Sequence, residues 1–313
     1  MRDLTRRQWL GSAALGGVAA ATGGATAHAQ ARASADDLVR AVKGARVFDL
    51  SFPWNDQAPV LGLNPPYAFA LNRTHRMTHE IFGQVPGSRV SWTSEIMHCS
   101  GQHGSPTLDA IGHIGRDLKL HGGVDAVTAT ATPGGIGAKL GVDHFPVDLM
   151  LNRAVVLDVA RQIAGGRPDP LPPGFEVTAA HLDATAKAQG VQVRPGDSLL
   201  IRTGWGQYFG KDNAKYLGEQ SPGPGQDAAR WIIDRKVRLA GNDTATFEKR
   251  PAAYGKELFS VHMMLLTDNG IYIMESANLE PLGDAKVGVA LLVVTPLRIE
   301  GGSGSPLRVL AVA

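Results

Sequence analysis

Cysteine is almost absent from this chain of 313 residues, because Cys99 is the only one. A single cysteine cannot form a disulfide within the chain, and it excludes the zinc sites that are built from several thiolates. Any metal ion bound by this chain must therefore be held by histidine, aspartate or glutamate.

An excess of charge of one sign is also lacking. The sequence has 31 lysines and arginines against 29 aspartates and glutamates, a net charge of +2, and no basic stripe interleaved with aromatic residues. Proteins that neutralise phosphates usually carry such a stripe, so we expect no nucleic-acid partner. Beyond Arg32 there is no internal repeat and no clear linker, which predicts one large globular domain.

A long, strongly apolar run is missing as well, even at the N-terminus. The segment "MRDLTRRQWLGSAALGGVAAATGGATAHAQA" places Arg6 and Arg7 before a short Ala/Gly-rich run, followed by a small-x-small cleavage site at Ala27–Ala29. This layout predicts a twin-arginine signal peptide over residues 1–29, a periplasmic location and a mature domain over residues 30–313. The alternative is a transmembrane anchor, but a span needs about 20 strongly apolar residues. We expect no membrane association of the mature form.

Strands alternate with helices through the middle of the chain, and the C-terminal part is rich in strands. This order predicts an α/β class, with one mixed β/β/α domain. Residues 64–87 contain three prolines and scattered charge, which predicts a long irregular loop that covers a site. One expected strand begins at Arg46, and another follows a turn within residues 194–205. The other expected strands lie in 153–160, 237–244, 270–277, 289–299 and 305–313. The expected helices lie in 178–190, with Thr178 as N-cap and Gly190 as its stop, and in 225–237.

The stretch "HGSPTLDAIGHIG", residues 103–115, has the composition of neither a helix nor a strand. Its glycines and proline allow a tight loop that turns His103, Asp109 and His113 inward. Imidazole and carboxylate are suitable ligands for zinc or manganese, and a hydrolytic site needs about three of them and an open position for water. The alternative is that both histidines are ordinary hydrogen-bonded side chains near a turn.

Seven sequence segments resemble those of the "putative cyclase" family and follow the same order along the chain. This family includes kynurenine formamidases and isatin hydrolases. The segments are the loop of residues 103–113, which is similar to the family's H-x-G-T-H-x-D-x-x-x-H, together with "FDLSFPW", "VVLDVA", "VRPGDSLLIRTGW", "LAGNDTATFE", "VHMMLLTDNGIYIMESANLEPL" and "PLRIEGGSGSPLRVLAV". The resemblance covers most of the mature chain. It implies the family's mixed β/β/α fold of the swivelling type, hydrolytic activity, a divalent metal with zinc expected ahead of manganese, and a homo-oligomer.

The resemblance also implies roles for five residues. His103 and Asp109 correspond to metal ligands of the loop, and His113 to its catalytic acid/base. His262 and Glu275 correspond to the later histidine and glutamate that help to hold a second metal in kynurenine formamidases. Glu275 lies inside an apolar strand, where a carboxylate is costly to bury unless it is paired or bound to a metal.

One position departs from the family motif. Thr107 stands where the family has its second ligating histidine. A neutral hydroxyl is a poor zinc ligand. The metal is then held weakly, moves toward the other implied ligands, or takes a neighbour such as His98 or Gln102.

The activity expected from these residues is metal-assisted hydrolysis of an amide or related acyl C–N bond in a small molecule, as in an arylformamidase. Trp54 could form an apolar wall for a ring substrate, or could simply anchor the N-terminal strand. The threonine at position 107 leaves a second possibility, a non-catalytic protein that binds a small molecule or a metal on the same scaffold.

Overall fold

The computed structural model describes residues 34–62, 64–65, 67–102, 105–252 and 257–313. The predicted signal peptide lies outside these residues. The chain divides into two compact units, residues 1–41 and 42–313. The described part of the first unit forms most of helix α1 (Ala35–Gly44), which has an exposed apolar side. The second unit, residues 42–313, contains the other described helices and all of the strands.

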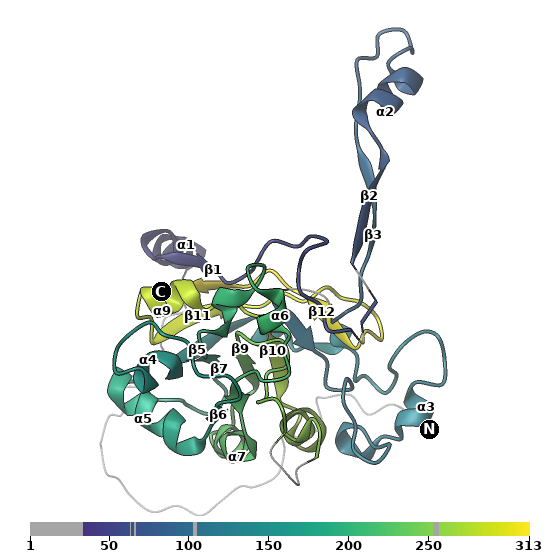
Figure 1. The fold of residues 1–313 in the computed structure, drawn as a ribbon. Helices are drawn as coiled ribbons and strands as arrows, with labels where there is room; N and C mark the ends of the chain where they lie inside the picture. Colours follow the sequence, from purple (N-terminus) through teal and green to yellow (C-terminus); the bar gives the residue numbers. More distant parts are fainter. Residues whose placement is uncertain (1–33, 63, 66, 103–104, 253–256) are drawn as a thin grey trace, which may run out of the picture. The chain divides into compact units, whose positions relative to one another are not determined.

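A nine-stranded mixed sheet forms the centre of this unit (Figure 1). The inner strands β5, β7, β9 and β10 run parallel, and antiparallel strands flank them on both sides. The strands are, in spatial order, β1 (Val47–Asp49), β13 (Leu310–Val312), β11 (Val289–Val293), β5 (Leu151–Asp158), β7 (Ser198–Arg202), β9 (Leu239–Asn242), β10 (Tyr272–Glu275), β4 (Thr107–Asp109) and β12 (Gly304–Pro306).

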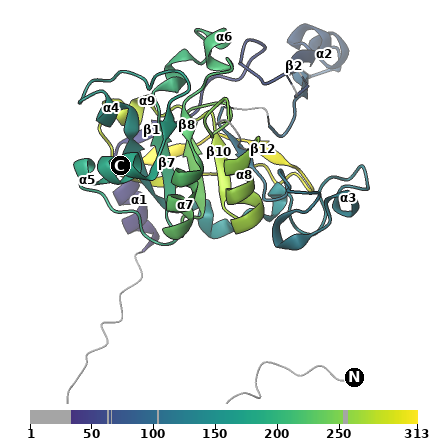
Figure 2. The same cartoon turned by 60° about the horizontal axis from the view of Figure 1, so that its bottom comes forward.

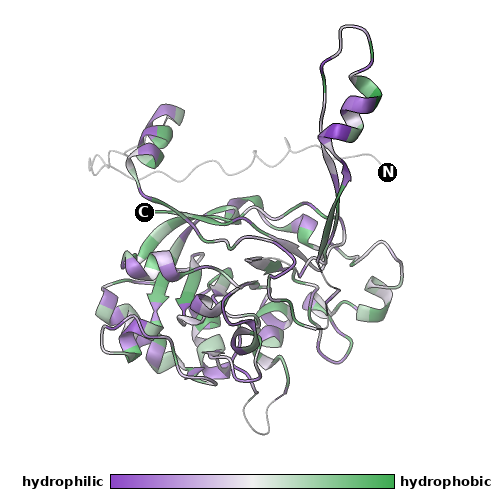
Figure 3. Ribbon diagram, turned by 45° about the horizontal axis from the view of Figure 1, so that its top comes forward, coloured by the Kyte–Doolittle hydropathy of each residue, from purple (hydrophilic) through white to green (hydrophobic). Residues whose placement is uncertain are grey.

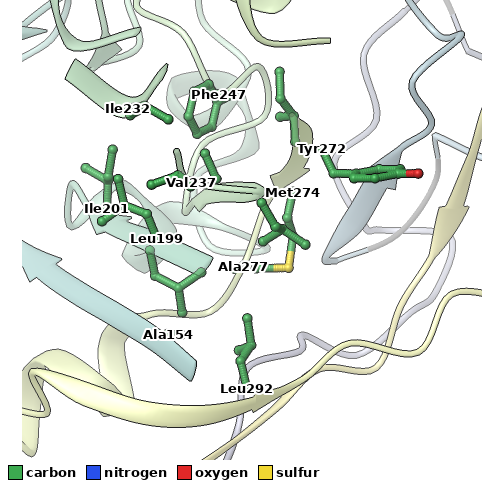
Figure 4. Close-up of a cluster of buried hydrophobic side chains, with 14 of the residues drawn as sticks. Ala154, Leu199, Ile201, Ile232, Val237, Phe247, Tyr272, Met274, Ala277 and Leu292 are labelled. Atoms are coloured by element: carbon green, nitrogen blue, oxygen red, sulfur yellow. The ribbon is translucent and has the colours of Figure 1, made fainter. Parts of the chain in front are cut away.

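Helices cover the parallel strands, and the principal core fills the space between them (Figures 2 and 4). Figure 4 shows Leu199 and Ile201 of β7 in the same cluster as Ile232 of α7. The helices are α3 (Ala126–Ala129), α4 (Val159–Ile163), α5 (Ala179–Gln189), α6 (Asn213–Tyr216), α7 (Gln226–Asp234), α8 (Ser260–His262) and α9 (Glu280–Asp284), with the short turns η1 (His121–Gly123), η2 (Val142–His144), η3 (Val147–Leu149), η4 (Trp205–Tyr208) and η5 (Met263–Thr267). None of the helices in the described residues has the length and hydropathy to cross a bilayer.

Most of the predicted elements are confirmed. Thr178 caps α5 by accepting a hydrogen bond from the backbone of His181, and Gly190 ends the helix at φ 65°. Strand β7 is wholly buried and β5 is buried from Ala154 to Asp158, as continuous apolar runs predict for parallel strands. The C-terminal stretch differs in detail: it forms two short strands, β12 and β13, which pair with β4 and β1.

Two predictions about loops are wrong. Residues 64–87 are not an irregular loop, because they contain strand β2 (Ala68–Arg73) and helix α2 (His75–Phe82). Strand β2 pairs with β3 (Ser94–His98), and a second small sheet joins β6 (Glu176–Val177) to β8 (Gly223–Pro224). The stretch from residue 103 contains strand β4, which takes a strand conformation because it is hydrogen-bonded between β10 and β12.

Candidate metal centre

Two buried carboxylates come together where β4 lies beside β10. Asp109 ends β4, Glu275 ends β10, and the two strands are antiparallel. Thr107 pairs directly with Glu275, and side chains two residues apart share one face of a strand. Asp109 and Glu275 therefore project from the same face of the sheet.

His262 completes this cluster. Its Nε2 lies 3.1 Å from Glu275 Oε1 and 3.8 Å from Asp109 Oδ2. One ligand atom from each of the three side chains lies within 4.8 Å of the other two, and all three residues are buried. Two carboxylates and one imidazole at this spacing can bind a divalent cation such as zinc or manganese.

The buried carboxylate of Asp109 indicates whether this cluster suits a cation. Neither of its carboxylate oxygens has a hydrogen-bond partner among the described residues, although the side chain is buried. Burial, together with the negative charge of Glu275, raises the pKa of Asp109 to about 6. Burial likewise raises the pKa of Glu275. Unpaired buried carboxylate oxygens are costly, and a bound cation would remove that cost. The residues present therefore fit a divalent metal.

Glu248 binds His262 through the backbone N–H and Nδ1, whereas Nε2 faces Glu275. One carboxylate oxygen of Glu248 accepts hydrogen bonds from the His262 backbone N–H at 2.9 Å and lies 2.8 Å from Nδ1. Burial alone would lower the pKa of His262, but the carboxylates of Glu248 and Glu275 outweigh it and raise this pKa to about 10. A carboxylate on the far nitrogen of a metal-binding histidine fixes the orientation of the ring. Sequence reasoning missed Glu248, although its block is one of the seven that resemble the family.

Unusual backbone conformations surround the cluster. Phe247 (φ 48°) precedes Glu248, Ser276 (φ 55°) follows Glu275, and Phe259 (φ 54°) begins α8. Immediately after His262 the chain continues as the π-helical turn η5. Positive φ at a non-glycine residue costs on the order of 1–3 kcal/mol, and both features concentrate at functional sites. The strained backbone at these positions thus fixes the directions of the Glu248, Glu275 and His262 side chains.

The cluster opens into a pocket of about 220 Å³. His113 forms part of the wall, with its Nδ1 3.4 Å from Gln102 Nε2. Burial lowers the pKa of His113, so the ring is neutral near pH 7. The lining combines polar groups with an apolar wall: Pro59, Val60, Leu61, Asn64, Gln102, Thr107, His113, Ile114, Leu217, Ala245, Thr246, Phe259, His262, Glu275 and Ser276.

Thr107 lines this pocket but is occupied by other bonds. Its hydroxyl donates a hydrogen bond to the carbonyl of Gly101 at 3.1 Å and lies 3.5 Å from that of Ser305. A hydroxyl that donates to backbone carbonyls is satisfied without a metal. Among the described residues, the candidate metal ligands are therefore the carboxylates of Asp109 and Glu275 and the imidazole of His262, and Thr107 is not one of them.

Of the residues singled out in the sequence, the structure brings together Asp109, His262 and Glu275, with His113 on the wall of the same pocket. His103 lies outside the described residues. Trp54 is half-buried and stacks on Tyr67, with ring centroids 5.3 Å apart, and it is not among the residues that line the pocket in the described part of the chain.

Comparison with known proteins identifies the family to which the chain is similar. The family model described as "Putative cyclase" matches residues 48–249. The isatin hydrolase of Roseibium aggregatum is 32% identical over 273 residues, which cover 85% of this chain and 91% of that protein.

Solved structures of similar proteins share the fold. The crystal structure of a protein described as a novel cyclase has a TM-score of 0.74 at 27% identity and covers 90% of this chain and 94% of its own. Isatin hydrolase A from Ralstonia solanacearum has a TM-score of 0.65 at 24% identity, with 89% of this chain and 95% of its own covered. At that identity the second likeness shows the fold alone.

Proposed function

The chain belongs to the cyclase family and is a hydrolase of that family, and we propose that it cleaves an amide or related acyl C–N bond of a small molecule. The relative from Roseibium aggregatum is an isatin hydrolase, and isatin is a cyclic amide. Cyclic amides and N-formyl amides are therefore the substrate classes that we put first.

The observation that carries this proposal is the buried cluster with the unpaired carboxylate of Asp109. Asp109, His262 and Glu275 would hold the cation, and zinc suits one imidazole and two carboxylates. When bound, such a metal supplies an activated water at neutral pH and polarises a carbonyl oxygen. Three protein ligands leave the open position that a hydrolytic site requires.

The remaining groups of the pocket fit the same reaction. We assign His113 the role of acid/base, because its ring is neutral near pH 7 and lies on the pocket wall. A neutral imidazole can accept the proton of a water and return it to the leaving nitrogen. The amide of Gln102 orients the ring. Apolar residues such as Leu61 and Phe259 suit a flat ring substrate.

A second function, metal or ligand binding without turnover, is favoured by Thr107. The family histidine is missing there, and the hydroxyl that replaces it is engaged with the backbone. Hydrolysis of any of the substrates named below distinguishes the two functions.

The experiment is elemental analysis of protein prepared without chelators, followed by a screen of N-formyl amides, cyclic imides, isatins and lactones. We expect close to stoichiometric metal in the wild type and its loss in Asp109→Asn, which keeps the side-chain shape but removes the charge. Asp56→Asn, at an exposed site outside the cluster, is the matched control and should retain the metal. Equal metal in the wild type and Asp109→Asn would refute the assignment.

A further inference from the structure

A second cavity, of about 380 Å³, lies among the helices at the carboxyl end of β5. We call it the second pocket; it is bounded by Asp158 at the end of β5, Arg161 of α4, Ala188 of α5, and Leu282 and Lys286 at the end of α9. The helices on this side of the sheet carry both hydrophilic and hydrophobic residues (Figures 1 and 3). In the described part of the chain, no residue lines both this pocket and the pocket at the metal centre.

Lys286 lines the second pocket from an unusual backbone position. It follows α9 at φ 53°; its N–H donates to the carbonyl of Gly283, and the N–H of Val287 donates to that of Leu282. Glycine is the usual residue at this left-handed position, because a side chain strains it. Lys236 has the same position after α7 but does not line the pocket, so the helix end alone marks no site. The distinguishing feature of Lys286 is the cavity beside it.

The positive charge of Lys286 is not neutralised. Among the residues that the structure describes, it forms no ion pair, and the acids of the neighbouring network are already shared. Asp158 lies 3.1 Å from Arg161 Nε and 2.8 Å from Arg202 Nη1, and Glu280 lies 2.7 Å from Arg202 Nη2. Three cations therefore stand against two carboxylates. The pocket has an excess of one positive charge, which favours an anionic ligand.

Arg161 supplies further hydrogen-bond donors to the same pocket. Its Nε donates to Asp158 at 3.1 Å, Nη1 to the carbonyl of Gly166 at 3.0 Å and Nη2 to that of Gly283 at 3.1 Å. A guanidinium carries five N–H groups, so two of them have no acceptor in the part of the chain that the structure describes. The three bonds hold the guanidinium in place, and the two remaining N–H groups suit a carboxylate.

Apolar side chains form another part of the wall. Leu282 is fully buried, and Val287 and Ala188 line the pocket beside it. The hydroxyl of Thr185 and the amide of Gln189 also line it, but both are hydrogen-bonded to the backbone. Small-molecule sites typically have volumes of roughly 300–1,000 Å³ and combine an apolar wall with a few polar groups. The second pocket matches this description.

We propose that the second pocket binds a small organic monocarboxylate with an apolar body. The carboxylate group lies against Lys286 and the two available N–H groups of Arg161, and the apolar body lies on Leu282 and Val287. The apolar wall favours an organic acid over inorganic phosphate. A metal cation is disfavoured, because Asp158 is the one carboxylate that lines the pocket in the described residues, and two arginines already pair with it. The site is separate from the metal centre, so the proposal does not depend on the proposed hydrolysis.

The first test titrates the metal-loaded protein with cyclohexanecarboxylate and follows assigned methyl groups by NMR. We expect the signals of Leu282 and Val287 to shift with a Kd on the order of 1 mM or tighter. Cyclohexanecarboxamide, which has the same shape without the charge, and inorganic phosphate should each bind at least about fivefold more weakly. The proposal is overturned by shifts only at Leu61 in the pocket of the metal centre, or by equal binding of the amide or of phosphate.

The second test compares two pairs of variants. Lys286→Gln should weaken binding of cyclohexanecarboxylate about fivefold or more, whereas Lys236→Gln, at the same position after α7, should bind like the wild type. Ala188→Leu places a larger side chain in the pocket and should weaken binding at least about tenfold. Ala184→Leu, one turn earlier on an exposed part of α5, is its control. Thermal unfolding checks that each variant is folded. Unchanged affinity in either pocket variant, or an equal loss in its control, would overturn the assignment.

Discussion

Thr107 and Glu275 are cross-strand partners in the antiparallel pairing of β4 with β10. Directly opposed residues place their side chains side by side on one face of a sheet. The position at which the sequence departs from its family's motif is therefore adjacent to a carboxylate of the metal centre. Substitutions at position 107 can test the centre without removing any of its ligands.

Thr107→His should tighten metal binding, because it adds an imidazole beside Asp109 and Glu275. The larger ring should also cost the metal-free protein on the order of 1–3 kcal/mol of stability, since Thr107 is buried. Competition titrations with a metal chelator and thermal unfolding of both forms measure the two effects. Thr107→Val, which removes the hydroxyl and adds no ligand, is the control. An affinity no higher than that of the valine variant would show that position 107 does not face the metal.

Glu248→Gln should weaken metal binding by roughly 10–100-fold, the usual effect of losing the carboxylate behind a ligating histidine. The amide preserves the shape of the side chain but removes the charge that raises the pKa of His262. Titration of this histidine by NMR in the metal-free protein should show a lower pKa in the variant. Glu257→Gln, on an exposed glutamate that pairs with Arg116, serves as control. An unchanged pKa of His262 would contradict the role given to Glu248.

The metal-free protein should lose stability as pH rises from about 4 to 6. The folded pKa of Asp109, about 6, lies above its ordinary value of 3.8, so the folded state binds this proton more tightly than the unfolded state. The resulting stability is complete below pH 4 and disappears as pH passes 6, a change of roughly 2–3 kcal/mol. Urea unfolding of the wild type and Asp109→Asn isolates this contribution, because other acids are common to both. Parallel curves for the two proteins would contradict it.

The proton bound by the Asp109 carboxylate competes with the metal for that carboxylate. Because a cation binds the ionised carboxylate, metal affinity should increase over this pH range by up to tenfold per unit for each proton released. Isothermal titration in two buffers of different ionisation enthalpy counts the protons released. A pH-independent affinity between pH 4 and 6 would mean that Asp109 is not a ligand.

We also propose that the chain is exported through the twin-arginine route. Replacing Arg6 and Arg7 together by lysine should retain the precursor in the cytoplasm, since the receptor reads the arginine pair. Arg2→Lys, outside the pair, is the control. Cell fractionation with immunoblotting measures the distribution, and normal periplasmic accumulation of the double variant would indicate a different route.

The sequence was sufficient to predict those helices and strands that carry a local signal, such as a cap residue, a stop residue or a continuous apolar run. Helix α5 has a threonine cap and a glycine stop, and β5 is a continuous apolar run. Strand β4 has neither signal: it is three residues long, and only its pairing with β10 and β12 makes it a strand. Residues 64–87 were predicted as a loop because their three prolines and scattered charges conceal strand β2, which depends on its pairing with β3.

The same contrast applies to the site. Asp109, His262 and Glu275 were found through a family motif, since acidic and imidazole side chains separated so widely in sequence show no common spacing. Glu248 was not singled out, because its role depends on a contact with His262 that arises only after α8 is placed. A buried acid beside positive-φ positions is a signal that becomes visible only in three dimensions.

The order of the strands delays the completion of the metal centre during synthesis. Strand β4 ends at Asp109, but the strands on either side of it begin at Tyr272 and Gly304. During synthesis the first ligand must wait, unpaired, until nearly the entire chain has emerged, and pairings of such sequence separation form slowly. Metal uptake by this protein therefore reports that β4 has paired with β10, and a truncated chain that lacks β12 would expose one edge of the strand that carries Asp109.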